Sequence, residues 1–345
     1  MSQIRAAPRN PIGAAPLRRP GSIRRTSSID TNWPEGRGLP MHMRGHARDL
    51  ITPADGSAAF TCAEDRIDVV ATQMREILDI VSTPPRAGVA ALIGKRAGGH
   101  LRAVLEEALP DERAAGTPLY LLLDDLSGAS LVAGWAWSQW DTDWLAKAKR
   151  QGAASTAGRG GKMEGICIGF APGSSALLAD GSSSPSQSST AVVPLENPAD
   201  ALGWHPLVAQ GGVGMRRARR IDIWRDGNVI NIDSGFQDSA TSPAGGRVAI
   251  HEYGVRATAD MARGELTAVT ADPRILPYPE CPGAAGNVQR LVGVNLLDLR
   301  KTVLSKLAGT AGCTHLNDVL RALAEVPQLL EKLRDNGKLQ NEWLA

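Results

Sequence analysis

The sequence predicts an α+β protein built of two related strand–helix units with a β-rich insertion between them. Two observations indicate this fold class. Segments such as residues 215–224 mix β-branched and charged residues in the alternation of strands, whereas apolar residues after Cys313 recur every three or four positions, as in an amphipathic helix. Two stretches of the chain also resemble each other in order and spacing. At 345 residues, the chain can bury a substantial core.

Composition divides the chain into four regions. Residues 1–40 hold many Pro, Arg and Ser, and we expect a disordered basic tail. Residues 41–150 are predicted to form a first, degenerate α+β copy. Residues 151–245 carry Ser/Gly-rich loops and the β insertion, and residues 246–345 form a second α+β copy with a Cys/His site.

Local patterns place the individual elements. Asp226-Gly227 is a strong hairpin signal. Residues 101–109 are predicted to form a helix that Pro110 ends. The Trp-rich residues 134–138 and the apolar residues 166–170 are predicted strands. The other predicted strands are 41–50, two within 66–80, 215–224, 228–232, 248–255 and 266–270, and the other predicted helices are 284–291, 296–307, the one after Cys313 and a charged helical end at 328–345.

An internal repeat supports the two-unit interpretation. Leu92-Ile93-Gly94 and Leu291-Val292-Gly293 are each followed by a Leu-Arg pair and then by a glycine-headed helix. Further upstream, Gly45-His46-Ala47 can be aligned with Ile250-His251-Glu252. The second copy has Cys313-Thr314-His315 where the first has Thr117-Pro118. It also has about ten extra residues, which carry Cys281, so we expect the site in the second copy.

Charge and cysteine usage exclude several classes of protein. The net charge is +2 with both signs well mixed, so the composition implies neither a nucleic-acid partner nor a membrane. No apolar run has transmembrane length, and the Arg-rich start lacks the apolar segment of a secretory signal. Four cysteines in so long a chain favour a reducing cytoplasm over a disulfide framework. We expect a small-molecule substrate and leave a homo-oligomer open.

The strongest candidate site surrounds Cys313 and His315. Cys313 is expected at a helix N-terminus, where partial positive charge favours the thiolate, and Thr314 with Asp318 is expected to cap that helix. His251, Cys281, Cys313 and His315 together make a plausible tetrahedral set for zinc or another divalent metal. In the alternative without metal, Cys313 is a nucleophile with His251 or His315 as its base, and Glu252 is a third candidate catalytic residue. A third interpretation leaves all these groups buried and structural.

The middle of the chain offers candidate substrate-binding residues. Ser174 and Ser175, in a Pro-Gly-Ser-Ser loop, can present hydroxyl and N–H groups to an anion. In a strand, Arg217 and Arg219 share one face and Arg216 and Arg220 share the other, so that one pair can bind an anionic substrate. A salt-bridged surface is the alternative for these arginines. Trp224 is a candidate wall of an aromatic pocket, with core packing as the alternative.

At these residues the chain resembles a bacterial family of unknown function, domain-of-unknown-function family 2889. Because the family has no activity known to us, the resemblance implies little about chemistry. The C-terminal half also resembles, more distantly, the U-type iron–sulfur assembly scaffolds, which bind zinc or a cluster. His251 stands where those scaffolds have their first cysteine, which disfavours a cluster and favours zinc. The stretches that match the first family are residues 25–30, 116–119, 169–170, 172–177, 215–224, 251–253, 280–282 and 312–318.

Together these features predict a metal-dependent, zinc-preferring, or Cys-dependent enzyme. We expect a lyase or hydrolase that acts on a small anionic aromatic or acyl substrate in bacterial catabolism. The alternative from another class is a non-catalytic scaffold protein that holds metal or sulfur.

Overall fold

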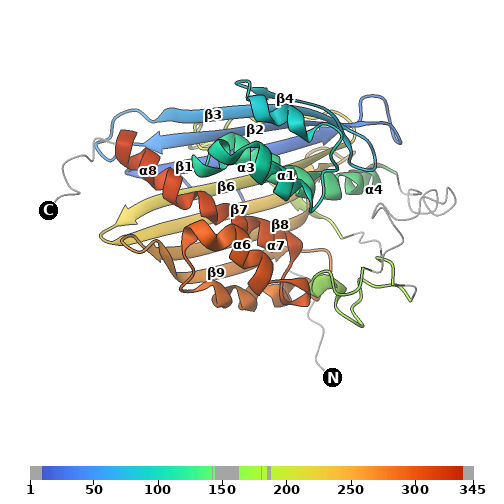
Figure 1. Cartoon of the computed structure of the whole chain (residues 1–345). Helices are drawn as coiled ribbons and strands as arrows, with labels where there is room; N and C mark the ends of the chain where they lie inside the picture. The colour runs from blue at the N-terminus through green and yellow to red at the C-terminus, as the bar shows by residue number, and fades with distance from the viewer. Residues whose placement is uncertain (1–9, 142, 144–162, 180, 185–187, 337–345) are drawn as a thin grey trace.

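A computed structural model describes residues 10–141, 143, 163–179, 181–184 and 188–336. Its centre is one antiparallel sheet of nine strands in the order β4-β3-β2-β1-β6-β7-β8, with β5 and β9 both paired to β8 (Figure 1). The strands are β1 (Ser22–Asn32), β2 (Met41–Thr52), β3 (Phe60–Ala71), β4 (Ile77–Thr83), β5 (Thr190–Val192), β6 (Gly214–Asp226), β7 (Val229–Thr241), β8 (Arg247–Asp260) and β9 (Glu265–Ile275).

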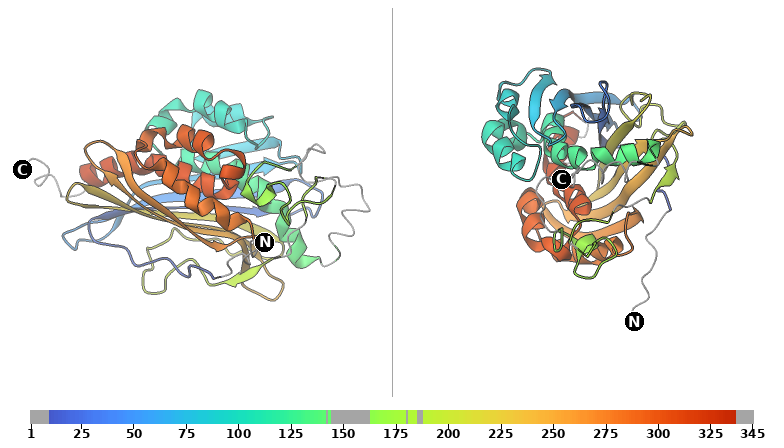
Figure 2. Two further views of the ribbon diagram at one scale, coloured as in Figure 1. Left: turned by 90° about the horizontal axis from the view of Figure 1, so that it is seen from below. Right: turned by 90° about the vertical axis from the view of Figure 1, so that its right-hand side faces the viewer.

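The helices cover one face of this sheet, which curls around them, and irregular segments cross the other face (Figure 2). Mixed helices and strands in separate runs make the protein α+β, as predicted. The α-helices are α1 (Leu101–Ala108), α2 (Pro110–Ala114), α3 (Pro118–Val132), α4 (Ala136–Trp140), α6 (Leu299–Lys306), α7 (Thr314–Ala322) and α8 (Val326–Asn336). The 3-10 helices are η1 (Ala87–Leu92), η2 (Ala133–Trp135), η3 (Ile168–Phe170), η4 (Cys281–Leu291), η5 (Leu296–Asp298), η6 (Gly309–Ala311) and η7 (Leu323–Glu325).

The sheet joins two runs of four strands, each followed by helices. β1 to β4 precede α1 to α3, and β6 to β9 precede α6 to α8. β1 and β6, the first strand of each run, pair with each other at the middle of the sheet. The strands β6 and β7, expected in an insertion, therefore belong to the same sheet as β8, because they hydrogen-bond in one continuous ladder.

Residues 22–32 correct the prediction of a disordered tail over residues 1–40, of which residues 1–9 lie outside the described part. β1 is paired on both sides, with β2 and β6, and is almost wholly buried. Its charged side chains are buried in ion pairs: Arg25, for example, is bound by Asp49 of β2. A strand with so few apolar residues is stable here because its charges are satisfied.

Several predicted elements are confirmed and others are wrong. The strands at 41–50, 215–224 and 248–255, the hairpin at Asp226-Gly227 and the helix at 101–109 are present. Residues 134–138 are helical rather than extended, and 168–170 form η3, because in each case local hydrogen bonds close a turn. Residues 151–162, at the start of the region predicted to carry Ser/Gly-rich loops, and residues 337–345, at the end of the predicted C-terminal helix, lie outside the described residues.

One detail of the expected repeat does not fit the element order. His46 lies on β2, the second strand of the first run, whereas His251 lies on β8, the third strand of the second run. Counting strands aligns β2 with β7 instead. The proposed match of Gly45-His46-Ala47 with Ile250-His251-Glu252 is therefore wrong.

His205 provides a test of the packing on the face of the sheet opposite the helices. Its ring is fully buried, with Nδ1 2.8 Å from Thr26 Oγ1 and Nε2 2.8 Å from Ser28 Oγ on β1. Burial, and then the neighbouring charges of His46 and Arg48, hold the pKa of His205 well below its ordinary value. The folded state therefore keeps His205 neutral where the unfolded chain takes up a proton.

We expect this histidine to make stability fall as the pH drops below about 6.5. Because the unfolded state binds the extra proton, the free energy of unfolding should decrease by about 1.4 kcal/mol per pH unit from this group. Urea unfolding at pH 7 and pH 5 measures the effect. His205→Gln should lose about 2 kcal/mol less than the wild type over that interval. An equal loss in both proteins would contradict the assignment.

Candidate metal centre

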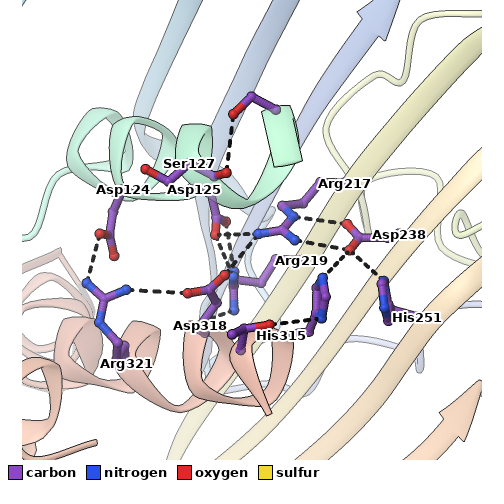
Figure 3. A network of polar contacts seen from close by, with 12 residues as sticks. Asp124, Asp125, Ser127, Arg217, Arg219, Asp238, His251, His315, Asp318 and Arg321 are labelled. Atoms are coloured by element: carbon purple, nitrogen blue, oxygen red, sulfur yellow. Dashed lines mark hydrogen bonds and ion pairs between the residues drawn. The ribbon is translucent and has the colours of Figure 1, made fainter. Parts of the chain in front are cut away.

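A network of buried ion pairs fills the space between the sheet and the helices. It links side chains of β6 and β7 to α3 above them and to α7 beside them (Figure 3). Each acidic or basic group in it is bound by at least one group of opposite charge from another element. Its members include Asp124 and Asp125 of α3, Arg217 and Arg219 of β6, Asp238 of β7, Arg300 of α6, and Asp318 and Arg321 of α7.

At one end of this network, two histidines meet one carboxylate. Asp238 lies directly opposite His251 in the β7–β8 ladder, and His315 reaches the same point from the first turn of α7. Asp238 Oδ2 is 3.3 Å from His251 Nδ1 and 3.8 Å from His315 Nε2. The two imidazoles stack with their centroids 3.5 Å apart. In the described part of the chain, these form the one group of three potential metal ligands whose donor atoms lie within 4.8 Å of one another.

Both facing nitrogens in this group lack a hydrogen-bond partner. His251 Nδ1 and His315 Nε2 are buried, and neither makes a hydrogen bond of acceptable geometry to Asp238 or to any other group. His251 as a whole is 6% exposed. Burying a polar atom without a partner costs free energy, so such atoms mark a place where a ligand can bind.

Arg217 fixes the carboxylate of Asp238. Its Nε donates to Asp238 Oδ1 at 2.9 Å and its Nη2 donates to Oδ2 at 3.0 Å. Burial favours the protonated acid, but the Arg217 charge and the adjacent histidines outweigh it and hold the pKa of Asp238 well below its usual range. Burial, followed by the proximity of His251, keeps the pKa of His315 well below its ordinary value. The group therefore combines a carboxylate with a neutral imidazole, the forms that bind metal.

Three of the four cysteines, Cys167, Cys281 and Cys313, form a separate, neighbouring cluster. Cys313 is the N-cap residue of α7, as expected, but its side chain makes no capping hydrogen bond. Asp318, predicted to help cap this helix, binds Arg217 instead. A Cβ on Gly169 would lie 3.0 Å from Cys281 Sγ and 3.7 Å from Cys167 Sγ, so both of these thiols border that glycine. Burial raises the pKa of Cys313 and of Cys281, which opposes the predicted thiolate. Neither sulfur belongs to the three-ligand group.

Glu252 does not join His251 and Cys313. Successive residues of a strand point to opposite faces, so Glu252 lies on the face away from the helices. There it accepts hydrogen bonds from Gln237 Nε2 at 2.8 Å and from the Ile12 N–H at 2.7 Å, and it lines a small cavity of about 30 Å³. Burial raises the pKa of this carboxyl. The three predicted catalytic residues are therefore divided between the two faces.

The predicted substrate-binding residues are dispersed as well. Arg217 and Arg219 do share the helix-facing side, as the alternation predicts, but both are below 3% exposed and bound by carboxylates. Ser175 gives its N–H and hydroxyl to Glu280, and Ser174 beside it is buried. Trp224 lies on the opposite face of β6, under the guanidinium of Arg19. The arginines thus form salt bridges, the alternative that the sequence left open.

Asp238 was missed because the return strand was predicted to end at residue 232. β7 continues to Thr241, and alternation from Ile230 and Ile232 directs Phe236 and Asp238 to the same face. A carboxylate at a core-facing position, in the strand next to His251, was the available signal.

A comparison with protein-family models finds a match for part of the chain. Residues 215–328, which contain Asp238, His251, Cys281, Cys313 and His315, match the family described as protein of unknown function, DUF2889. No curated protein and no solved structure matches the chain significantly. Among the described residues, no helix has both the length and the hydrophobicity required to cross a bilayer. The resemblance seen in the sequence is thus confirmed over residues 215–328, which match the model of the DUF2889 family.

Proposed function

We propose that this chain is a divalent-metal protein whose ion is bound by Asp238, His251 and His315. The observation that carries the proposal is the pair of buried, unpartnered imidazole nitrogens beside one carboxylate oxygen. Asp238 replaces the two cysteines of the set expected from the sequence. Three protein ligands leave a coordination position for water or substrate, as in catalytic zinc sites.

The donor types favour zinc or another ion that binds imidazole. Two nitrogens and one oxygen suit Zn²⁺ and its transition-metal neighbours, whereas Ca²⁺ and Mg²⁺ prefer oxygen donors. Because Arg217 already binds both oxygens of Asp238, this carboxylate is expected to bind an ion through Oδ2 alone. The Thr314 hydroxyl, 3.4 Å from His315 Nδ1, can orient that ring from behind.

We further propose that the two strand–helix runs are copies of one unit. Arg25 and Asp49 are cross-strand partners on β1 and β2, as Arg217 and Asp238 are on β6 and β7. Arg25 binds Asp49 through the same two nitrogens that Arg217 uses. The turns that follow η1 and η4 also agree, since Gly94 donates to Ile77 O of β4 at 2.8 Å and Gly293 donates to Leu266 O of β9 at 2.7 Å.

The comparison of the two units supports a cation beside Asp238. In the first unit, Asp49 Oδ2 accepts a hydrogen bond of 2.8 Å from the Lys332 ammonium. In the second unit, the corresponding oxygen of Asp238 faces the two imidazoles instead. If the units are copies, Lys332 marks the position of a positive charge. A metal ion would supply that charge in the second unit.

As an enzyme, the protein is proposed to be a lyase or hydrolase acting on a small anionic aromatic or acyl substrate in the bacterial cytoplasm. The metal would polarise an oxygen of the substrate or activate water. The burial of His251 favours a second candidate function, in which a non-catalytic scaffold holds the ion without turnover.

Metal analysis of the purified protein tests the proposal. We expect one equivalent of a divalent ion in the wild type, and less than a tenth of that in His251→Gln and His315→Gln. Cys281→Ser is the matched control, and it should keep its metal. Loss of metal from Cys281→Ser, with retention in both histidine variants, would favour the ligands predicted from sequence. A wild type that binds no divalent ion would refute the metal proposal.

Turnover separates the two candidate functions. The metal-loaded wild type and His315→Gln should be compared on a panel of small carboxylate-bearing esters and thioesters. Turnover by the wild type alone supports the enzyme. Stoichiometric metal without turnover of any substrate in the panel favours the scaffold.

A further inference from the structure

Helix α3, which belongs to the first strand–helix run, contacts the residue that holds the proposed metal ligand of the second. Arg217 is 2% exposed and is surrounded by three carboxylates. Nε and Nη2 of Arg217 bind Asp238, as described above. Its third nitrogen, Nη1, donates to Asp318 of α7 at 3.1 Å and lies 3.7 Å from Asp125 of α3. The guanidinium is therefore positioned from several directions, and only one of these carboxylates is a proposed metal ligand.

Gly128 allows this arrangement. A Cβ on Gly128 would lie 1.7 Å from Arg217 Nη1 and 2.5 Å from its Cζ, so the guanidinium packs directly against the backbone of α3. Glycine inside a helix costs about 1 kcal/mol relative to alanine. In α3 that cost is offset by the close approach of Arg217, which no larger residue permits.

From these contacts we infer that Arg217 is a positioning residue for the metal centre, and that α3 sets its position through Gly128 and Asp125. This inference rests on the proposed metal function and extends it. Arg217 binds no metal itself. It fixes the rotamer of Asp238, so that Oδ2 is directed towards His251 and His315 (Figure 3). Groups that orient a metal ligand in this way typically contribute 10- to 100-fold in affinity.

Two substitutions test the inference by different routes. Arg217→Lys keeps the charge but removes the planar two-nitrogen contact with Asp238. Gly128→Ala keeps Arg217 but displaces its guanidinium. Both should weaken Zn²⁺ and Co²⁺ binding about 10- to 100-fold, measured by competition with a chromophoric chelator. Both should also alter the visible spectrum of bound Co²⁺, which reports ligand geometry.

Matched controls separate positioning from a general loss of stability. Arg25→Lys makes the same change in the corresponding pair of the first unit and should leave Zn²⁺ affinity unchanged. Gly134→Ala adds a methyl group where no atom lies within 4 Å and should likewise have no effect. Circular dichroism and thermal unfolding establish that each variant is folded. Should Arg217→Lys fail to fold, Gly128→Ala carries the test.

The outcomes distinguish this inference from the proposed function. If the wild type binds neither Zn²⁺ nor Co²⁺, both the proposed metal function and the positioning role of Arg217 are wrong. If the wild type binds but Arg217→Lys and Gly128→Ala bind equally well with an unchanged Co²⁺ spectrum, only the positioning role is wrong. Equal weakening by Arg25→Lys would also overturn it, because the effect would then come from general destabilisation.

Discussion

Arg25→Met is expected to lower the free energy of unfolding by about 3–5 kcal/mol. The Arg25 side chain is fully buried and binds Asp49 at 2.6 Å and Glu325 at 3.0 Å, both of which are also buried. Although burial favours the protonated acid, the Arg25 charge holds the pKa of Asp49 below its usual value. Removal of the guanidinium leaves the carboxylates of Asp49 and Glu325 buried with fewer cationic partners. The free-energy cost of burying these charges is then no longer offset by the ion pairs with Arg25.

Urea unfolding of the wild type and the variant measures this difference. Arg66→Met is the matched control, since Arg66 pairs with Glu64 at the surface, with 54% and 35% of the two side chains exposed. Its cost should stay below about 1 kcal/mol. Equal effects of the two substitutions would show that the buried network contributes no more than a surface ion pair.

The second large effect is stabilisation by metal. An ion that binds the folded state alone raises the free energy of unfolding by about 2.7 kcal/mol at one hundred times its dissociation constant, and by about 4.1 kcal/mol at one thousand times. Zn²⁺ should therefore shift the unfolding midpoint of the wild type to higher urea concentration. His315→Gln should show no such shift at the same concentrations, because one of three ligands is missing.

Cys313→Ser is the control for this measurement. Cys313 precedes the helix that carries His315, but its sulfur lies outside the three-ligand group. The variant should keep most of the Zn²⁺-dependent shift. If Cys313→Ser loses the shift and His315→Gln retains it, the ion is held by the thiols and the centre proposed above is wrong.

The sequence predicted those strands whose side chains follow local alternation. β6 and β8 were identified in this way, and so was the division of Arg216 to Arg220 between two faces. β1 was not, because its interior carries arginines and serines. What makes β1 a strand is contact with distant groups, such as Glu325, which lies 300 positions away from Arg25. No local pattern encodes a pairing of that range.

The candidate site was predicted in part for the same reason. His315 was chosen for its position beside Cys313 and His251 for its place in the second copy, and the structure brings these two together. The third ligand depended on the register of β7 against β8, which pairs Asp238 with His251. Register follows from the whole sheet, so spacing along the chain could not distinguish Asp238 from the two cysteines.

The central position of β1 has a consequence for the order in which the chain is made. Its partner β2 follows within a few residues, but its other partner, β6, is synthesised only after residue 213. Until then a nascent chain whose first four strands have folded presents one long side of β1 unpaired, with open N–H and C=O groups. While residues 84–213 are being synthesised, this open edge can pair with another chain, so aggregation is favoured during that interval.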